Sequence, residues 1–253
     1  MAKKWQETLP TDLVFDEAKH RYTYKGEYVP GVTTVLGAQI PKPALMFWTV
    51  KVMAEYLHEN FQLERPYSLD EFSALVESGK KAHSIKKVEA ATIGTKAHAW
   101  IEAHIRAALH SEPYPDMPED AQVLNAVNAF MTWESSNQVV YIASEKKVFS
   151  RDWMVAGIAD VLATVNGRNT LIDLKTSNTI YDEHYMQTAA YAAMLEQMES
   201  FWSDNICIMR IGKDDGQFEA HEFSGELRKK FEERFGVCVK GYFLDKEIKE
   251  LKK

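Results

Sequence analysis

Short apolar runs separated by turn residues open the chain and predict an N-terminal hairpin. The expected strands cover residues 14–15, 20–25 and 28–29. Lys25-Gly26 provides the turn between the second and third strands. The β-branched run 32–36 fits either a further strand or the start of a helix. The apolar spacing over residues 44–61 is that of a helix.

The next part of the chain has a helical pattern with two interruptions. The expected segments are a helix over residues 68–109, a proline-rich loop over 111–118 and a helix over 119–136. Ser68 and Glu71, three residues apart, form the pattern of a capping box, in which each side chain satisfies a backbone amide of the other residue. Gly79 and Gly94 are expected to break the first of these helices.

The second half of the chain changes to a strand pattern. Strands are expected at residues 139–143, 147–149, 154–165 and 170–175, then a helix at 181–201, strands at 206–211 and 218–223, and a last helix from 224. Hairpin turns are expected at Arg151-Asp152, Asn166-Gly167 and residues 213–216. This order predicts an α/β fold: a central mixed sheet with an antiparallel start and a crossover helix, flanked by helices.

A chain of 253 residues fits one large domain. We expect a hairpin and helical elaboration over residues 1–90, a core over 91–223 and a C-terminal helix over 224–253. The most apolar helical stretch, residues 189–195, is too short to span a bilayer, and the N-terminus lacks an apolar signal segment. Both features favour a cytoplasmic protein.

Charge and cysteine content narrow the possible chemistry. A net charge of −7 counts against a protein that coats nucleic acid through charge alone, but it suits a site rich in carboxylates. Cys207 and Cys238 form no CxxC pair, so cysteines alone cannot hold a zinc finger or an iron–sulfur cluster. A disulfide between them stays open, and a reduced pair is favoured.

The most informative residues are two aspartates and a lysine on neighbouring expected strands. Asp173 and Lys175 point to the same face of their strand, and the Asn166-Gly167 turn can bring Asp160 close to Asp173. Close carboxylates repel each other unless a cation lies between them, and Mg²⁺ prefers oxygen ligands. An isolated Asp-x-Lys is more often a solvated surface, but here the flanking residues are apolar, which favours a site.

Other polar residues are weaker candidates. His98 and Glu102 are four residues apart and share one face of an expected helix. Glu102 could therefore support a metal ligand or be a metal ligand itself, although a solvated charge is the favoured alternative. Glu145 could lie near the metal, although a salt bridge to Lys146 or Lys147 is slightly favoured.

Gln187 and Tyr191 share one face of the expected crossover helix, four residues apart. By themselves they would be an ordinary half-exposed stripe. Because Asp173 and Lys175 lie just upstream, the two side chains are expected to face the site and to hydrogen-bond the lysine, a carboxylate or the substrate backbone.

Taken together, the ordered motifs resemble the RecB-like branch of the PD-(D/E)xK nuclease superfamily. The motifs are Gly-x-x-x-His at 94–98, Gly-x-x-Asp at 157–160, Asp-x-Lys at 173–175 and Gln-x-x-x-Tyr at 187–191. The resemblance implies a restriction-endonuclease-like core. It also implies that His98, Asp160, Asp173 and the backbone carbonyl of Leu174 ligate Mg²⁺ or Mn²⁺, that Lys175 is catalytic, and that Gln187 and Tyr191 position the substrate or the lysine.

The same resemblance implies a stand-alone, phage-type exonuclease that acts on linear single- or double-stranded DNA in recombination and repair. A single-strand-annealing or other recombination protein and a homo-oligomer are possible partners. The chain lacks a Walker A motif, so no nucleotide cofactor is expected, and it lacks the four cysteines of iron–sulfur relatives. Two alternatives stay open: a structure-specific endonuclease, and a non-catalytic DNA-binding or assembly module on a decayed nuclease fold.

Two features of the N-terminal half could contact nucleic acid. Aromatic residues could stack on single-stranded bases, although core positions are favoured: Tyr22, Tyr24, Tyr28, Phe47 and Trp48. Lysines over residues 80–96 could contact phosphates, with a solvated helix face as the default: Lys80, Lys81, Lys86, Lys87 and Lys96.

Overall fold

The computed structural model describes residues 9–16, 18–19, 21–177, 179–198, 201–211 and 218–253. These residues form two compact units. The larger comprises Met1–Ile40 and Ala97–Lys253, and the smaller comprises Pro41–Lys96. The described residues up to Ile40 therefore group with the sheet-bearing part of the chain.

The N-terminal strands form a small antiparallel sheet. It contains β1 (Leu13–Asp16), β2 (Arg21–Tyr24) and β3 (Glu27–Val29), in that order. Lys25 and Gly26 have φ of 52° and 83°, as the predicted tight turn requires. The ambiguous run that follows is a helix, α1 (Val32–Gln39), which buries Val32, Val35 and Leu36.

The smaller unit contains α2 (Pro43–Asn60) and most of α3 (Leu69–His110). The capping box is confirmed: the Ser68 amide donates to Glu71 at 2.8 Å, and the Glu71 amide donates to Ser68 Oγ at 3.2 Å. The predicted breaks at Gly79 and Gly94 are wrong, because α3 is continuous. A Cβ on Gly79 would lie 3.4 Å from the Leu57 side chain, so this glycine serves close packing against α2.

The larger unit contains a five-stranded mixed sheet with strand order β4-β5-β6-β7-β8. Its elements are α4 (Ala121–Ser135), β4 (Val139–Ser150), β5 (Val155–Val165), β6 (Arg168–Lys175), α5 (Asp182–Gln197), β7 (Asn205–Ile211), β8 (Phe218–Phe223) and α6 (Gly225–Leu251). All neighbouring strands are antiparallel except β6 and β7, which are parallel and joined through α5. The predicted α/β fold class, with a central mixed sheet flanked by helices and an N-terminal hairpin, is confirmed.

Several element boundaries differ from the sequence prediction. Residues 139–143 and 147–149 belong to the single strand β4, which continues through a bulge near Tyr141. Helix α5 ends at Gln197 rather than near residue 201. The turn expected at 213–216 lies outside the described residues, whereas the Asn166-Gly167 turn is present, with φ of 50° and 81°.

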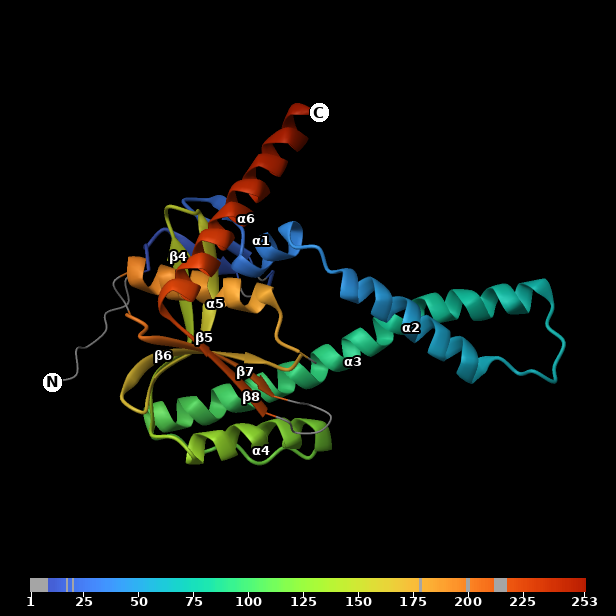
Figure 1. The fold of residues 1–253 in the computed structure, drawn as a ribbon, viewed down its shortest axis with the longest axis horizontal. Helices are drawn as coiled ribbons and strands as arrows, with labels where there is room; N and C mark the ends of the chain where they lie inside the picture. The colour runs from blue at the N-terminus through green and yellow to red at the C-terminus, as the bar shows by residue number, and fades with distance from the viewer. Residues whose placement is uncertain (1–8, 17, 20, 178, 199–200, 212–217) are drawn as a thin grey trace. The chain divides into compact units, whose positions relative to one another are not determined.

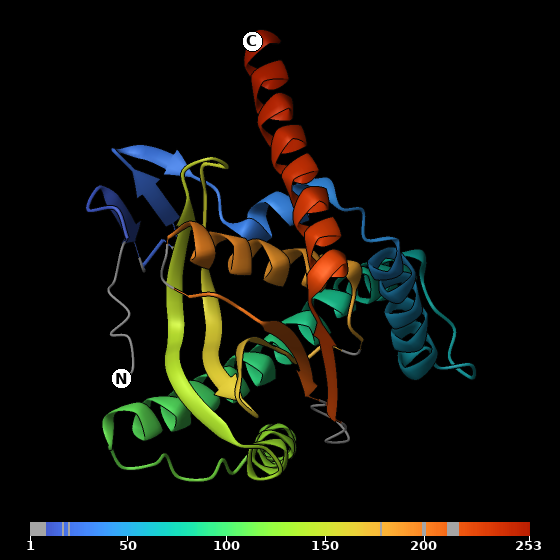
Figure 2. The same ribbon diagram turned by 60° about the vertical axis from the view of Figure 1, so that its left-hand side comes forward.

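Helices cover both faces of the five-stranded sheet (Figures 1 and 2). Helix α5 lies across one face, with α1 and α6 packed against it around a shared core. Helix α4 and the last turns of α3 lie on the other side of the sheet. The alanines of α5, such as Ala189 and Ala190, are fully buried, so this helix approaches the strands closely.

The described helices and the two cysteines bear on membrane insertion and on disulfide formation. None of the described helices is long and apolar enough to cross a membrane. Cys207 and Cys238 are both buried and free, which confirms the reduced alternative.

Candidate active site

Strands β5 and β6 part at the point where the two predicted aspartates lie. The pairing of the two strands ends at Val161 and Ile172, and the next residues beyond this last pair are Asp160 on β5 and Asp173 on β6. Oδ2 of Asp160 accepts a hydrogen bond of 2.9 Å from the backbone amide of Leu174. A side chain of β5 thus satisfies this amide of β6, and it fixes the Asp160 carboxylate beside the end of β6.

Asp173 and Lys175 form a buried ion pair on β6. The Lys175 ammonium nitrogen lies 2.5 Å from Oδ2 of Asp173, with side-chain exposures of 17% and 1%. Burial raises the pKa of Asp173 against the opposing effect of Lys175, and the charge of Asp160 adds to the rise. The pKa of Lys175 is raised because Asp173 and Asp160 outweigh the burial that disfavours its charge.

Helix α5 presents its polar residues to this pair. The Gln187 side-chain amide donates to the Tyr191 hydroxyl at 3.2 Å and makes a long contact of 3.5 Å with Oδ1 of Asp173. His184, one turn earlier, is buried and close enough to Asp173 to lower its pKa. The structure therefore brings the predicted Gln187 and Tyr191 to the carboxylates, and it adds His184, which the sequence gave no reason to select.

The packing of the same helix explains why residue 157 is a glycine. A Cβ built at this position would lie 2.5 Å from Cε1 of Tyr191, closer than real Cβ atoms come. Only glycine leaves room for this buried ring beside β5. The glycine of the Gly-x-x-Asp motif and the tyrosine of the Gln-x-x-x-Tyr motif are thus parts of one packing arrangement.

Glu145 of β4 belongs to the same group of carboxylates. Its neighbours Ser144 and Lys146 pair with Val161 and Ala159, the two residues that flank Asp160. Its backbone has a φ of 50°, which marks an irregular point of the strand. Desolvation of its carboxyl group, although the residue as a whole is exposed, and then the charges of Asp160 and Glu102 raise the pKa of Glu145 to about 7.

Among the described ion pairs, none joins Glu145 to Lys147. Lys147 instead places its ammonium group over the ring of Phe15, 5.2 Å from the centroid. The half-buried Glu102 acts electrostatically on Glu145, so this position of α3 lies near the carboxylate group.

His98 lies one turn before Glu102 on α3 and is half-buried. Within the described ranges, no three His, Cys, Asp or Glu side chains are close enough together to hold a metal ion. The ligand set His98, Asp160 and Asp173 therefore stays a prediction.

The chemistry of the donors fits a hard divalent cation. Asp160 and Asp173 offer carboxylate oxygens, which Mg²⁺ and Mn²⁺ prefer. Oδ2 of Asp173 is completely buried, and the ammonium group of Lys175 lies beside it, so this oxygen is held next to a positive charge instead of water. A buried carboxylate oxygen in this state has a free lone pair for a cation.

Arg210 is a residue that the sequence pattern did not single out. It is the parallel partner of Lys175 on β7, it is 6% exposed, and it donates to Glu219 at 2.8 Å. Its Nε has no hydrogen-bond partner in the described part of the chain. The strand pairing could have indicated it, since paired residues of parallel strands share a sheet face.

The N-terminal aromatic residues are structural only in part, because Phe47 is 74% exposed and the core position favoured for it is wrong. Tyr22 is buried, and Tyr24 packs on Phe149 with ring centroids 4.9 Å apart. Of the lysines in the smaller unit, Lys80 and Lys86 pair with Glu77 and Glu55 respectively.

Comparisons with known proteins do not assign the chain to a family. No protein-family model matches it, and neither does any curated protein. Among solved structures, one described as the crystal structure of SSO0001 is similar over 57% of this chain and 69% of that chain, with 15% sequence identity and a TM-score of 0.27. A TM-score this low does not establish a shared fold.

Proposed function

We propose that this protein is a divalent-metal-dependent nuclease that hydrolyses phosphodiester bonds of linear DNA as an exonuclease. One observation carries the proposal. The buried Asp173 lies beside Lys175, Asp160 and Gln187 at the point where β5 and β6 part. Burying several charges costs free energy, and buried groups of interacting charges are concentrated at functional sites.

Each residue has a role in this proposal. Asp160 and Asp173 would hold Mg²⁺ or Mn²⁺, together with the backbone carbonyl of Leu174 and, as the family resemblance implies, His98. A bound divalent cation lowers the pKa of water and stabilises negative charge on a phosphate. Lys175 keeps its positive charge and stabilises the negative charge that develops on the scissile phosphate.

Gln187 and Tyr191 hold these groups in place. The Gln187 amide bridges the Tyr191 hydroxyl and Oδ1 of Asp173, so it fixes the orientation of that carboxylate. Because Tyr191 belongs to α5 and its ring packs against Gly157 of β5, the bridge rests on rigid elements. On this proposal the protein acts in the cytoplasm, where DNA is accessible.

The test is digestion of end-labelled single- and double-stranded linear DNA and of closed circular DNA, with Mg²⁺, Mn²⁺ or EDTA. The variants Asp173→Ala and Lys175→Ala are compared with Asp152→Ala, a change at an exposed turn residue. We expect metal-dependent loss of linear DNA, abolished in the first two variants and retained in the third.

Other outcomes separate the alternatives. Cleavage of closed circles would contradict the exonuclease and support an endonuclease at the same site. Metal binding without cleavage of any DNA would contradict the catalytic proposal and leave a DNA-binding module.

A further inference from the structure

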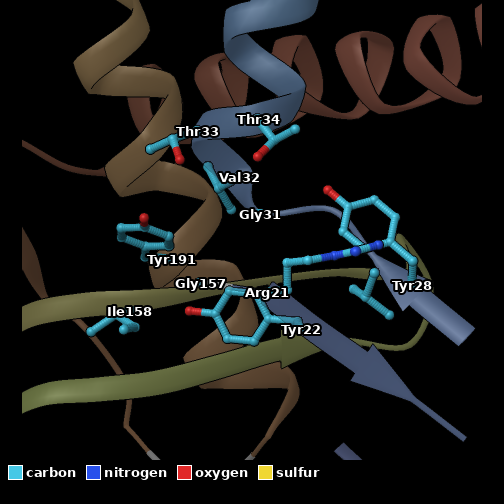
Figure 3. A pocket seen from close by; sticks show the side chains of 11 residues that line it. Arg21, Tyr22, Tyr28, Gly31, Val32, Thr33, Thr34, Gly157, Ile158 and Tyr191 are labelled. Atoms are coloured by element: carbon cyan, nitrogen blue, oxygen red, sulfur yellow. The ribbon is translucent and has the colours of Figure 1, made fainter. Parts of the chain in front are cut away.

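Strand β6, which carries Asp173 and Lys175, has a different neighbour on each side. On the β5 side, Tyr191 and Gly157 line a pocket of about 180 Å³, which Figure 3 shows. On the other side, β7 places Arg210 next to Lys175, because the two residues are paired in the parallel register. Neighbouring strands lie about 4.8 Å apart, and paired residues point to the same face. Arg210 is therefore a second cation beside the candidate catalytic lysine, and it does not line the pocket of Figure 3.

The side chain of Arg210 is buried, whereas its acidic partner is not. The side-chain exposure is 7% for Arg210 and 43% for Glu219, the residue opposite it on β8. Removing the charge of an arginine from water costs free energy, so arginine is rarely buried to this extent. Water could solvate the exposed carboxylate without any help from the arginine. The need of Glu219 for a partner therefore does not explain why the arginine is buried here.

The guanidinium group of Arg210 is only partly used. Its Nη2 donates to Oε1 of Glu219 at 2.8 Å, but its buried Nε has no hydrogen-bond partner in the described part of the chain. Nε and Nη2 lie on one edge of the guanidinium and together match the two oxygens of a carboxylate or a phosphate. Glu219 thus fills one donor of this edge, and the other is left unpaired at a cost in free energy.

A neighbouring histidine explains why Glu219 fills only one donor. Oε2 of Glu219 lies 3.8 Å from Nε2 of His221, two residues further along β8 and on the same face. Nδ1 of His221 shares a hydrogen bond of 2.6 Å with the Tyr185 hydroxyl of α5, which holds the ring in place. The two oxygens of Glu219 are therefore divided between Arg210 and His221. A phosphate that offers two oxygens to the same edge is a better partner for the arginine.

We propose that Glu219 is an internal competitor of the substrate for Arg210. In the free protein the Glu219 carboxylate occupies the guanidinium group. When a DNA strand reaches Lys175, one of its phosphates displaces the carboxylate and accepts hydrogen bonds from both Nε and Nη2 of Arg210. The inference rests on the proposed nuclease function, since that function brings the strand to Lys175.

The competition predicts effects of opposite sign for the two partners. If the ion pair only held β7 and β8 together, the loss of either side chain would weaken the protein and its DNA binding alike. If Glu219 competes with the strand, Glu219→Gln strengthens DNA binding and Arg210→Gln weakens it. The sign of the Glu219→Gln effect therefore separates competition from a structural role.

Binding in EDTA tests the proposal without cleavage. Fluorescence anisotropy measures the affinity of the full chain for a labelled single-stranded 12-mer. The variants are Arg210→Gln, Arg210→Lys, Glu219→Gln and the double variant Arg210→Gln/Glu219→Gln. Glu222→Gln is the matched control, because it removes the same charge from β8 at a position that faces the other side of the sheet.

We expect Arg210→Gln to weaken binding about tenfold, and Arg210→Lys nearly as much, since an ammonium group cannot engage two oxygens in the same way. Glu219→Gln should tighten binding about threefold, and Glu222→Gln should have a clearly smaller effect. In the double variant, the gain from Glu219→Gln should disappear, because the arginine that it frees is absent. Glu219→Gln changes an exposed residue, so it tests the proposal even if the Arg210 variants do not fold.

Three results would overturn the proposal: weaker binding in Glu219→Gln, the same gain from Glu219→Gln with and without Arg210, or unchanged binding in all variants. The two proposals also fail separately. Opposite shifts in binding without any cleavage under Mg²⁺ or Mn²⁺ would retain the competition and remove the nuclease. Metal-dependent cleavage with unchanged DNA binding in the Arg210 and Glu219 variants would retain the nuclease and remove the competition.

Discussion

Replacing Gly157 by alanine is the most direct perturbation of the packing behind the site. The added methyl group would lie 2.5, 3.2 and 3.3 Å from three ring atoms of Tyr191. Carbon atoms at optimal contact are about 3.5–4.0 Å apart, so the ring or the strand must move by roughly 1 Å. Tyr191 is 4% exposed and belongs to the main core, so moving its ring disturbs the packing around it.

The expected cost follows from this overlap. Forcing an extra methyl group into a packed core destabilises a protein by about 1–3 kcal/mol. For a chain of this size, that corresponds to a fall in Tm of about 2–12 °C. DNA cleavage should fall as well, because the moved ring carries the hydroxyl to which Gln187 donates.

Urea unfolding and the cleavage assay measure the two effects, and Gly37→Ala is the control. Gly37 is also a glycine of the larger unit, lies in α1, and has nothing within 4 Å of its ideal Cβ. Alanine there should stabilise the protein by up to about 1 kcal/mol, through helix propensity. A Gly157→Ala protein as stable as the original would refute the packing argument.

A double-mutant cycle tests the named contact. Leucine at position 191 lacks the ring atoms that meet the new methyl group. In a Tyr191→Leu background, Gly157→Ala should therefore cost at least about 1 kcal/mol less than in the original protein. An equal cost in both backgrounds would show that the ring is not the source of the strain.

Two further predictions concern titratable groups. Burial opposes the charge of Glu134, but hydrogen bonds from His104 and Tyr141 outweigh it and lower its pKa below the usual 4.5. The folded state thus favours the carboxylate, so this stabilisation is present above about pH 4.5 and lost as the pH falls further. Glu134→Gln should cost about 2 kcal/mol at pH 7 and less at pH 3 in urea unfolding, and a constant difference would contradict this. Burial raises the pKa of Cys207 to about 12, and Cys238 is buried too. A thiol reagent at pH 8 should therefore label both cysteines only after the protein is denatured. Rapid labelling of Cys207 in the native protein would contradict its burial.

Local signals in the sequence were sufficient where a few adjacent residues determine the conformation. The Ser68–Glu71 capping box and the Asn166-Gly167 turn are such cases, because their hydrogen bonds and positive φ values are local properties. The same applies to the meander, whose alternating apolar residues predicted the strands. These elements were enough to predict that Asp160 and Asp173 lie on neighbouring strands.

Features that depend on distant contacts could not be predicted from local patterns. Gly79 was expected to end a helix, but it packs against Leu57 of the preceding helix and α3 continues. The polar residues at 144–146 were expected to interrupt the strand, whereas β4 runs through them as an irregular strand. The places of Arg210 and His184 likewise depend on the parallel pairing of β7 and the docking of α5.

The irregular strand β4 also affects how the protein behaves at high concentration. Strands β4 and β8 are the edges of the five-stranded sheet, and exposed edges can template aggregation by adding strands from other molecules. On β4, the bulge near Tyr141 and the left-handed backbone of Glu145 disrupt the regular ladder that an incoming strand needs. The irregular residues that place Glu145 beside Asp160 therefore also protect this edge from pairing with other molecules. Changes that made β4 regular would lower the solubility of the protein and would also disturb the candidate active site.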